Sequence, residues 1–153
     1  MKHLRLTVLL LVAMVGSGLV AVGVSSPAEA VTATVYRNVA ARNVNDVRTD
    51  RDLHALKRGA CLDKFAQRQA RRMARKQTLY HQRLETVQSR CGMTYVGETV
   101  AAGYKKARGA VRRGLMHSDA HRAILLDAPS RRMGAGAKKR HGTWYLCVLV
   151  AHK

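Results

Sequence analysis

The sequence has few acidic and few aromatic residues. It contains only 9 Asp and Glu against 28 Lys and Arg, which gives a formal net charge of +19. One Trp, one Phe and five Tyr are its only aromatic residues. Because base stacking needs aromatic side chains, nucleic acid is not expected as a specific partner. The positive charge would instead draw the chain to anionic cell-envelope polymers or lipids through a field that salt screens.

Cysteine is also scarce, with three residues in the chain. An odd number leaves one cysteine over when the others pair. Cys61 opens a predicted helix and Cys91 follows it in a predicted loop, so these two are the expected disulfide. The chain-entropy description gives a loop of this length about 3–4 kcal/mol of stabilisation. Cys147 lies within the apolar run 145–150, where a free thiol behaves as a small buried hydrophobe.

The one long apolar run lies near the start of the chain. Lys2, His3 and Arg5 precede an apolar stretch over 6–24, and Ala28-Glu29-Ala30 follows as a small-residue cleavage motif. This pattern predicts a secretory signal peptide over 1–30, cleaved after Ala30, and hence an extracellular protein. An uncleaved anchor is the alternative, because about 19 apolar residues nearly span a bilayer. Residues 31–153 have the length of a single domain, which we expect to be monomeric.

The hydrophobic spacing predicts a mixture of helices and strands. We expect an α+β fold with a small, mostly antiparallel sheet. Gly97 lies inside a predicted strand, where glycine indicates close backbone approach. Ser118 is the expected N-cap of the last helix. The predicted helices span 34–47, 62–74, 105–116 and 119–125; the strands span 95–103, 132–137 and 143–151; a connector covers 48–59, a turn 138–142, and a less regular stretch runs from 81 to 91.

Several enzyme classes lack their sequence signatures here. There is no phosphate-binding P-loop, no dinucleotide glycine pattern and no nucleophile elbow of the Gly-x-Ser-x-Gly kind. Among the acidic residues only Glu98 has a plausible cleft position, so a glycosidase with paired carboxylates is not supported.

Several short polar motifs remain, and each lies where a predicted helix meets a loop or strand. They are Leu79-Tyr80-His81, Gly97-Glu98-Thr99 and the stretch 115–125, which contains Ser118-Asp119-Ala120-His121-Arg122. In this order, and followed by Met133-Gly134-Ala135-Gly136 and Trp144-Tyr145, the motifs resemble those of the CAP superfamily. This is the SCP-like group of cysteine-rich secretory proteins, venom antigens and pathogenesis-related proteins, and the likeness is to its bacterial secreted branch. It covers about 35–150.

The resemblance implies an α-β-α sandwich with a central cleft. Position by position, His81 and His121 match the family's two histidines and Glu98 its first acid, and some members bind zinc there. The family's second acid would fall at Ser118. A metal site here would therefore have one negative charge fewer. Thr99 stands where the family usually has Asn, and Leu115 where it usually has Trp.

Two interpretations of the cleft stay open at this stage. His81, Glu98 and His121 would ligate a metal such as zinc, or Glu98 would orient His81 without one. A rival metal pair is His117 with His121, four residues apart, although an N-cap at Ser118 would leave His117 outside the helix. Arg122 would meet an anionic ligand at the cleft rim or form a structural salt bridge.

These features give three hypotheses for function. The first is a secreted, non-catalytic binder of a small polar or lipid-like ligand, held near the cell envelope by its basic surface. The second is a zinc-dependent hydrolase that uses metal-activated water with Glu98 as base. The third is a general cationic binder of polyanions.

Overall fold

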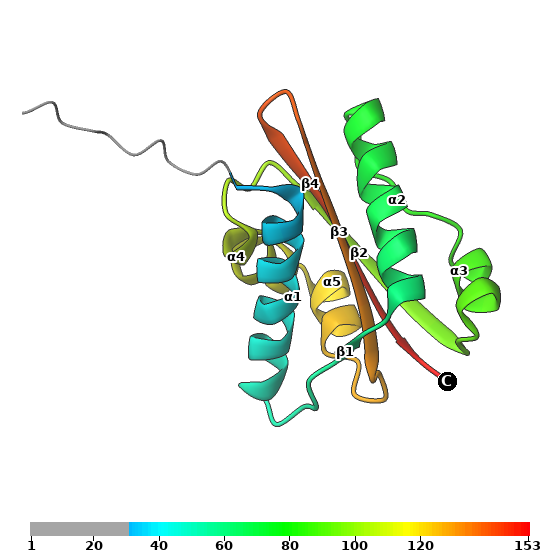
Figure 1. Cartoon of the computed structure of the whole chain (residues 1–153). Coiled ribbons are helices and arrows are strands. Elements are labelled where there is room, and N and C mark those ends of the chain that lie inside the picture. Colours follow the sequence, from blue (N-terminus) through cyan, green and yellow to red (C-terminus); the bar gives the residue numbers. More distant parts are fainter. Residues whose placement is uncertain (1–30) are drawn as a thin grey trace, which may run out of the picture.

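The computed structural model describes residues 31–153 and shows three layers (Figure 1). Residues 1–30, for which the sequence predicts a signal peptide, lie outside the described part. Helices α1 (Ala33–Thr49), α4 (Ala107–Gly109) and α5 (Asp119–Leu125) lie on one side of a sheet. Helices α2 (Ala60–Lys76) and α3 (Leu84–Cys91) lie on the other. The predicted α+β fold and the α-β-α sandwich are therefore confirmed.

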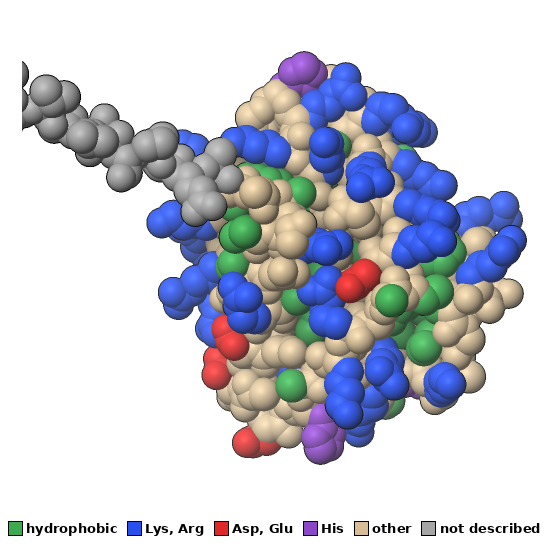
Figure 2. All heavy atoms as spheres, viewed as in Figure 1, with side chains coloured by type: hydrophobic (Ala, Val, Ile, Leu, Met, Phe, Trp, Pro, Cys, Tyr) green, Lys and Arg blue, Asp and Glu red, His purple; other side chains and the backbone are tan. Residues whose placement is uncertain are grey.

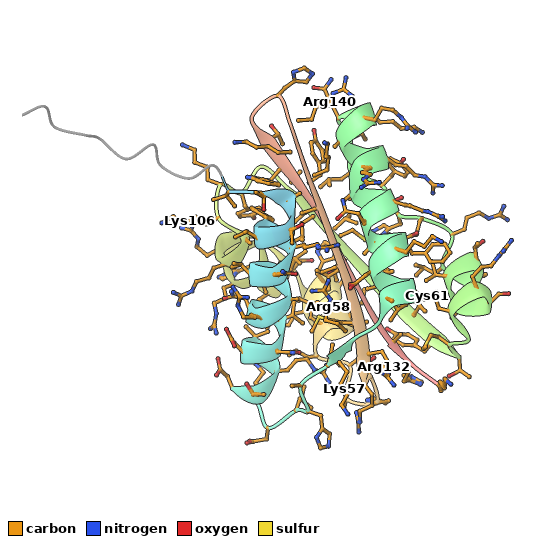
Figure 3. All side chains as sticks on the ribbon, viewed as in Figure 1. Lys57, Arg58, Cys61, Lys106, Arg132 and Arg140 are labelled. Carbon is orange, nitrogen blue, oxygen red and sulfur yellow. A yellow bond between two sulfur atoms is a disulfide. The ribbon has the colours of Figure 1, made fainter. Side chains whose placement is uncertain are left out.

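The sheet contains four strands in the order β1-β3-β4-β2. They are β1 (Lys57–Arg58), β2 (Tyr95–Ala102), β3 (Arg132–Arg140) and β4 (Thr143–His152). The longer three pair antiparallel, and β1 pairs parallel with the start of β3, where Figure 3 shows Lys57 and Arg58 near Arg132. Strand β2 has a partner on one side only, so its outer edge is one of the two free edges of the sheet.

Strand β4 divides the apolar interior into two cores. Its side chains alternate between the two faces of the sheet, as those of a strand must. The set that begins at Trp144 packs against α1, α4 and α5, and the set that begins at Tyr145 packs against α2 and α3. This explains why the last strand is apolar almost without interruption. The first set is Trp144, Leu146, Val148 and Val150; the second is Tyr145, Cys147, Leu149 and Ala151.

Glycines allow two helices to lie directly on the sheet. A Cβ at Gly134 would meet the backbone of Leu62 in α2, so α2 packs on β3 with no side chain between them. A Cβ at Gly97 would come within 2.7 Å of Ile124 Cγ2 in α5 and of the Tyr95 hydroxyl oxygen. At Gly97, which the sequence predicted to mark close backbone approach, the close neighbours are therefore these two side chains.

Two features hold the helices and loops together. Cys61 and Cys91 form the predicted disulfide, with their Cα atoms 5.7 Å apart, and tie α2 to α3. Arg48 at the end of α1 is fully buried and donates to the backbone carbonyls of Leu125 (2.8 Å) and Asp127 (2.9 Å). It also donates to the carbonyl of His54 at 2.9 Å, so one guanidinium joins α1 to two loops.

Four local predictions were wrong. The stretch before Gly92 is not irregular but forms α3, so Cys91 ends a helix rather than lying in a loop. The 48–59 connector contains strand β1. The expected helix 105–116 breaks into α4, a π-helical turn (Ala110–Gly114) and a 3₁₀ turn (Leu115–His117). Strand β3 continues through most of the expected turn, which is reduced to His141 and Gly142, both with positive φ.

The described part contains no helix long and apolar enough to cross a membrane.

Candidate functional site

The candidate site is built around Glu98, a charged residue in the middle of the free edge strand β2. The residue is only 2% exposed. Its neighbours at the same face of the strand, Val96 and Val100, belong to the core beneath α2 and α3. Burial of an unpartnered carboxylate would be very costly, so the contacts of Glu98 decide whether this position is tolerable.

Glu98 has a donor for each of its carboxylate oxygens. Oε1 contacts His81 Nδ1 at 2.9 Å and accepts the backbone N–H of Gln82 at 3.0 Å. Oε2 accepts from the side-chain amide of Gln82 and from the Cys147 thiol, whose Sγ lies 3.3 Å away. The carboxylate is therefore saturated by fixed neighbours, and no oxygen is left to act as a free base.

His81 is held at this point by the loop that follows α2. The helix ends at Gln77 in a left-handed conformation (φ 53°), which turns the chain back toward the sheet. Gln69, fully buried in α2, donates its side-chain amide to the carbonyl of Tyr80. The His81 side chain is 55% exposed although its partner Glu98 is fully buried. With Nδ1 engaged by the carboxylate, Nε2 is the ring nitrogen available to a ligand.

His121 lies in the layer on the other side of the sheet. It lies on α5, which packs on β2 where Gly97 allows close approach. Partial burial lowers the pKa of His121, and the neighbouring His81 lowers it further by charge repulsion. The charge on one imidazole is thus felt by the other, and His121 favours the neutral form.

The residues do not fit a three-ligand metal centre. Within residues 31–153 no three His, Cys, Asp or Glu side chains are grouped as a metal ion requires. Glu98 is turned to His81 Nδ1 and Gln82, which is the arrangement of a carboxylate that orients an imidazole. Two imidazoles remain, one ligand short of the usual catalytic zinc site. No chemical step is therefore derived through a metal here.

Three other residues named from the sequence make no hydrogen bond with Glu98 or His81. Ser118 occupies the N-cap position of α5 in extended conformation, but its hydroxyl makes no capping bond. Arg122 donates to the carboxylate of Asp119 at 2.8 Å and to the carbonyl of Met116 at 3.2 Å, so it makes the structural salt bridge. His117 lies before the helix, and its Nδ1 is 3.0 Å from the carbonyl oxygen of Arg112.

Sequence reasoning missed two partners of Glu98. Gln82 directly follows His81, but no pattern marks a glutamine as a partner of a strand residue far along the chain. Cys147 is free and buried, and burial first, then Glu98, raises the pKa of its thiol well above the usual value. It is thus an S–H donor to the carboxylate as well as a core residue. The signal that could have found Cys147 is the strand register. Alternate side chains of β4 point to the same face of the sheet, and β2 is paired beside β4.

One departure from the family motif is visible in the geometry. Thr99 is fully buried on β2, and its hydroxyl oxygen has no hydrogen-bond partner. The resemblance implies Asn at this position, whose amide would reach further than a hydroxyl.

Comparison with known proteins agrees with this fold. The model of the cysteine-rich secretory protein family, CAP, matches residues 41–151. The chain therefore belongs to the CAP family. None of the curated protein sequences matches it.

Solved structures show the same fold at low sequence identity. An outer surface protein of Borrelia burgdorferi superposes with a TM-score of 0.72 at 16% identity, over 80% of this chain and 96% of that one. An extracellular SCP-domain protein of Bacillus anthracis gives 0.68 at 18%, over 84% of this chain and 45% of that one. A cysteine-rich secretory protein of Staphylococcus aureus gives 0.66 at 19%, over 83% and 40%. The chain spans less than half of the latter two.

Proposed function

We propose that this CAP domain is an extracellular, non-catalytic binding module. Its ligand, small and polar or lipid-like, would be recognised by His81 and His121 at the free edge of the sheet, and its positive charge would keep it near an anionic cell envelope. The secretory leader pattern, the disulfide and the extracellular relatives support the location.

The saturated carboxylate of Glu98 carries this proposal. A hydrolase needs a free base or nucleophile beside its substrate, whereas both oxygens of Glu98 are occupied and the Cys147 thiol is held protonated within the core. The same contacts fix His81 with one nitrogen outward. The arrangement suits recognition of a polar group by two preset imidazoles better than it suits turnover.

The test is a titration of residues 31–153 with two soluble probes, glycerol phosphate and dihexanoyl phosphatidylglycerol, followed through the imidazole NMR signals. We expect at least one probe to shift the signals of both His81 and His121 with one dissociation constant. The variants His81→Ala and His121→Ala should each weaken binding at least tenfold, and His54→Ala, which removes an exposed imidazole elsewhere, should not. If neither probe moves both signals, the proposal is wrong.

The zinc-dependent alternative is tested with the same protein. Titration with Zn²⁺ alone, followed by calorimetry, should show no tight binding that both histidine variants abolish. Micromolar binding that requires both His81 and His121 would instead restore the metal hypothesis.

A further inference from the structure

Basic side chains of α2 form one wall of a groove. The groove lies between α2 and α3, encloses about 580 Å³ and contains five cations and no carboxylate among its lining residues. The cations are Lys64, Arg68, Arg72, Arg83 and Arg90. The space-filling view shows Lys and Arg side chains gathered over this part of the molecule (Figure 2).

We propose that this groove is a binding site for a flexible phosphate polymer that carries no bases. The proposal sharpens the envelope-retention part of the proposed function, because it replaces diffuse attraction by one defined surface. It does not depend on the His81–His121 site.

The first argument is that the five cations lack partners. The ion pairs formed within residues 31–153 involve Arg58, His81, Arg112 and Arg122, and none uses a groove cation. The side chains of all five are exposed. Unpaired like charges held together repel one another, so a polyanion in the groove would relieve repulsion as well as release counterions.

The second argument is the spacing and fixation of the two walls. Lys64, Arg68 and Arg72 follow one another at four-residue intervals, which places a charge every 6 Å or so along α2. The Cys61–Cys91 disulfide joins the first turn of α2 to the last turn of α3 (Figure 3 shows Cys61 at the start of α2), so the walls cannot separate there. A row of charges along a fixed groove suits an extended chain of phosphates.

The third argument distinguishes this polymer from two other polyanions. Phe65 is the only aromatic side chain that lines the groove, and the Arg68 guanidinium lies 5.7 Å from its ring centroid. The ring is thus already covered, and bases of a nucleic acid would gain little stacking. A concave surface between two helices also admits a single chain more readily than the flat face of a bilayer.

The test compares two variants that lose equal charge. The groove variant is Arg68→Gln/Arg72→Gln/Arg83→Gln. The control is Lys105→Gln/Lys106→Gln/Arg108→Gln, three exposed residues around the start of α4 in the other layer. The probe is inorganic polyphosphate of defined length, and the dissociation constant is measured from 50 to 300 mM salt, with circular dichroism to check that both variants fold.

We expect the groove variant to bind polyphosphate at least tenfold more weakly at 100 mM salt, and the control to change by less than threefold. The slope of log affinity against log salt should fall by about 2 for the groove variant, since each lost phosphate contact removes roughly 0.7. Equal losses in the two variants would overturn the groove while leaving envelope retention by general charge intact. No binding by the unaltered protein would overturn both.

Two further arms identify the class of polyanion. Oligo(dT) with the same number of phosphates should bind no more tightly than polyphosphate; binding tighter by tenfold would show a nucleic-acid site and contradict the proposal. Vesicles containing phosphatidylglycerol should respond equally to both variants. A loss of vesicle binding in the groove variant alone would assign the groove to lipid surfaces instead.

Discussion

Arg48 and Glu98 are two buried charges on opposite sides of the same sheet, and they are satisfied in different ways. Arg48 donates only to backbone carbonyls, one at the end of α5 and the others in loops, at 2.8–2.9 Å for the three shortest contacts. Glu98 accepts largely from side chains, and one of them, His81, is more than half exposed. The first charge fastens chain segments together, whereas the second links the interior to a group that solvent and ligands can reach. The two buried charges therefore differ in what their partners present to solvent, and only Glu98 has a partner that is more than half exposed.

The largest effect is expected where Arg48 is removed. Arg48→Met should lower the free energy of unfolding by about 3–5 kcal/mol, because several buried carbonyls lose their donor at once. Urea denaturation monitored by circular dichroism measures this loss. The imidazole signals of His81 and His121 in the folded fraction should stay in place. A loss below 1 kcal/mol would show that water replaces the guanidinium and that the fastening role is wrong.

A smaller effect is expected where the two layers meet beside Glu98. Gly97→Ala places a Cβ 2.7 Å from Ile124 Cγ2, so α5 must move away from β2. Overpacking of this kind costs about 1–3 kcal/mol. Because α5 contains His121, the imidazole signal of His121 should shift while that of His81 shifts less. In the variant Gly92→Ala the new Cβ meets no atom within 4 Å, but Gly92 has a positive φ. This variant therefore controls for backbone strain and not for a new side-chain contact.

Glu98→Gln sharpens the comparison with Arg48, since it keeps the shape of the side chain and removes its charge. The new amide group must face the donors of Gln82 and Cys147, so we expect a loss of about 1–2 kcal/mol of stability. The main result should be local, with the His81 ring becoming mobile on the nanosecond scale. NMR relaxation of the ring carbons measures this. An unchanged order parameter for His81 would mean that the carboxylate does not hold it.

The smallest effect is a dependence of stability on pH. The pKa of His121 is lowered in the folded state, so folding favours its neutral form. The stability that this provides is complete above the unfolded value of about 6.5 and is lost as pH falls from there through the lowered folded pKa. Between pH 7.5 and 5.5 the unaltered protein should lose more stability than His121→Gln. Equal losses in both proteins would contradict the lowered pKa.

Much of the fold follows from the sequence because its pattern is regular. The amphipathic repeat of α2 and the apolar run of β4 predict a helix against a sheet, and the glycines of β3 and β2 mark where helices lie on it. Helix α3 was missed because its eight residues contain one buried apolar side chain, Val87, and so give little periodicity. Strand β1 was missed because two residues show no alternation, and its pairing depends on β3, which is far along the chain.

The candidate site was predictable in part for a related reason. His81, Glu98 and His121 belong to motifs with a fixed order, so their approach could be expected before any coordinates. The roles of Gln82 and Cys147 depend on how the loop after α2 sits against the paired strands β2 and β4. The groove likewise needs α3, and no sequence pattern places Arg83 and Arg90 opposite α2. Charges near in space and distant in sequence have no signature in either segment.

The most direct test of the account is the tautomer of His81, read from the ¹⁵N signals of its ring at pH 8.5, where a free imidazole is neutral. If Glu98 holds His81, the proton lies on Nδ1 and Nε2 is bare, and Glu98→Gln abolishes this preference. A proton on Nε2 in the unaltered protein would contradict the account, because the carboxylate would then not be setting the face that His81 presents to a ligand.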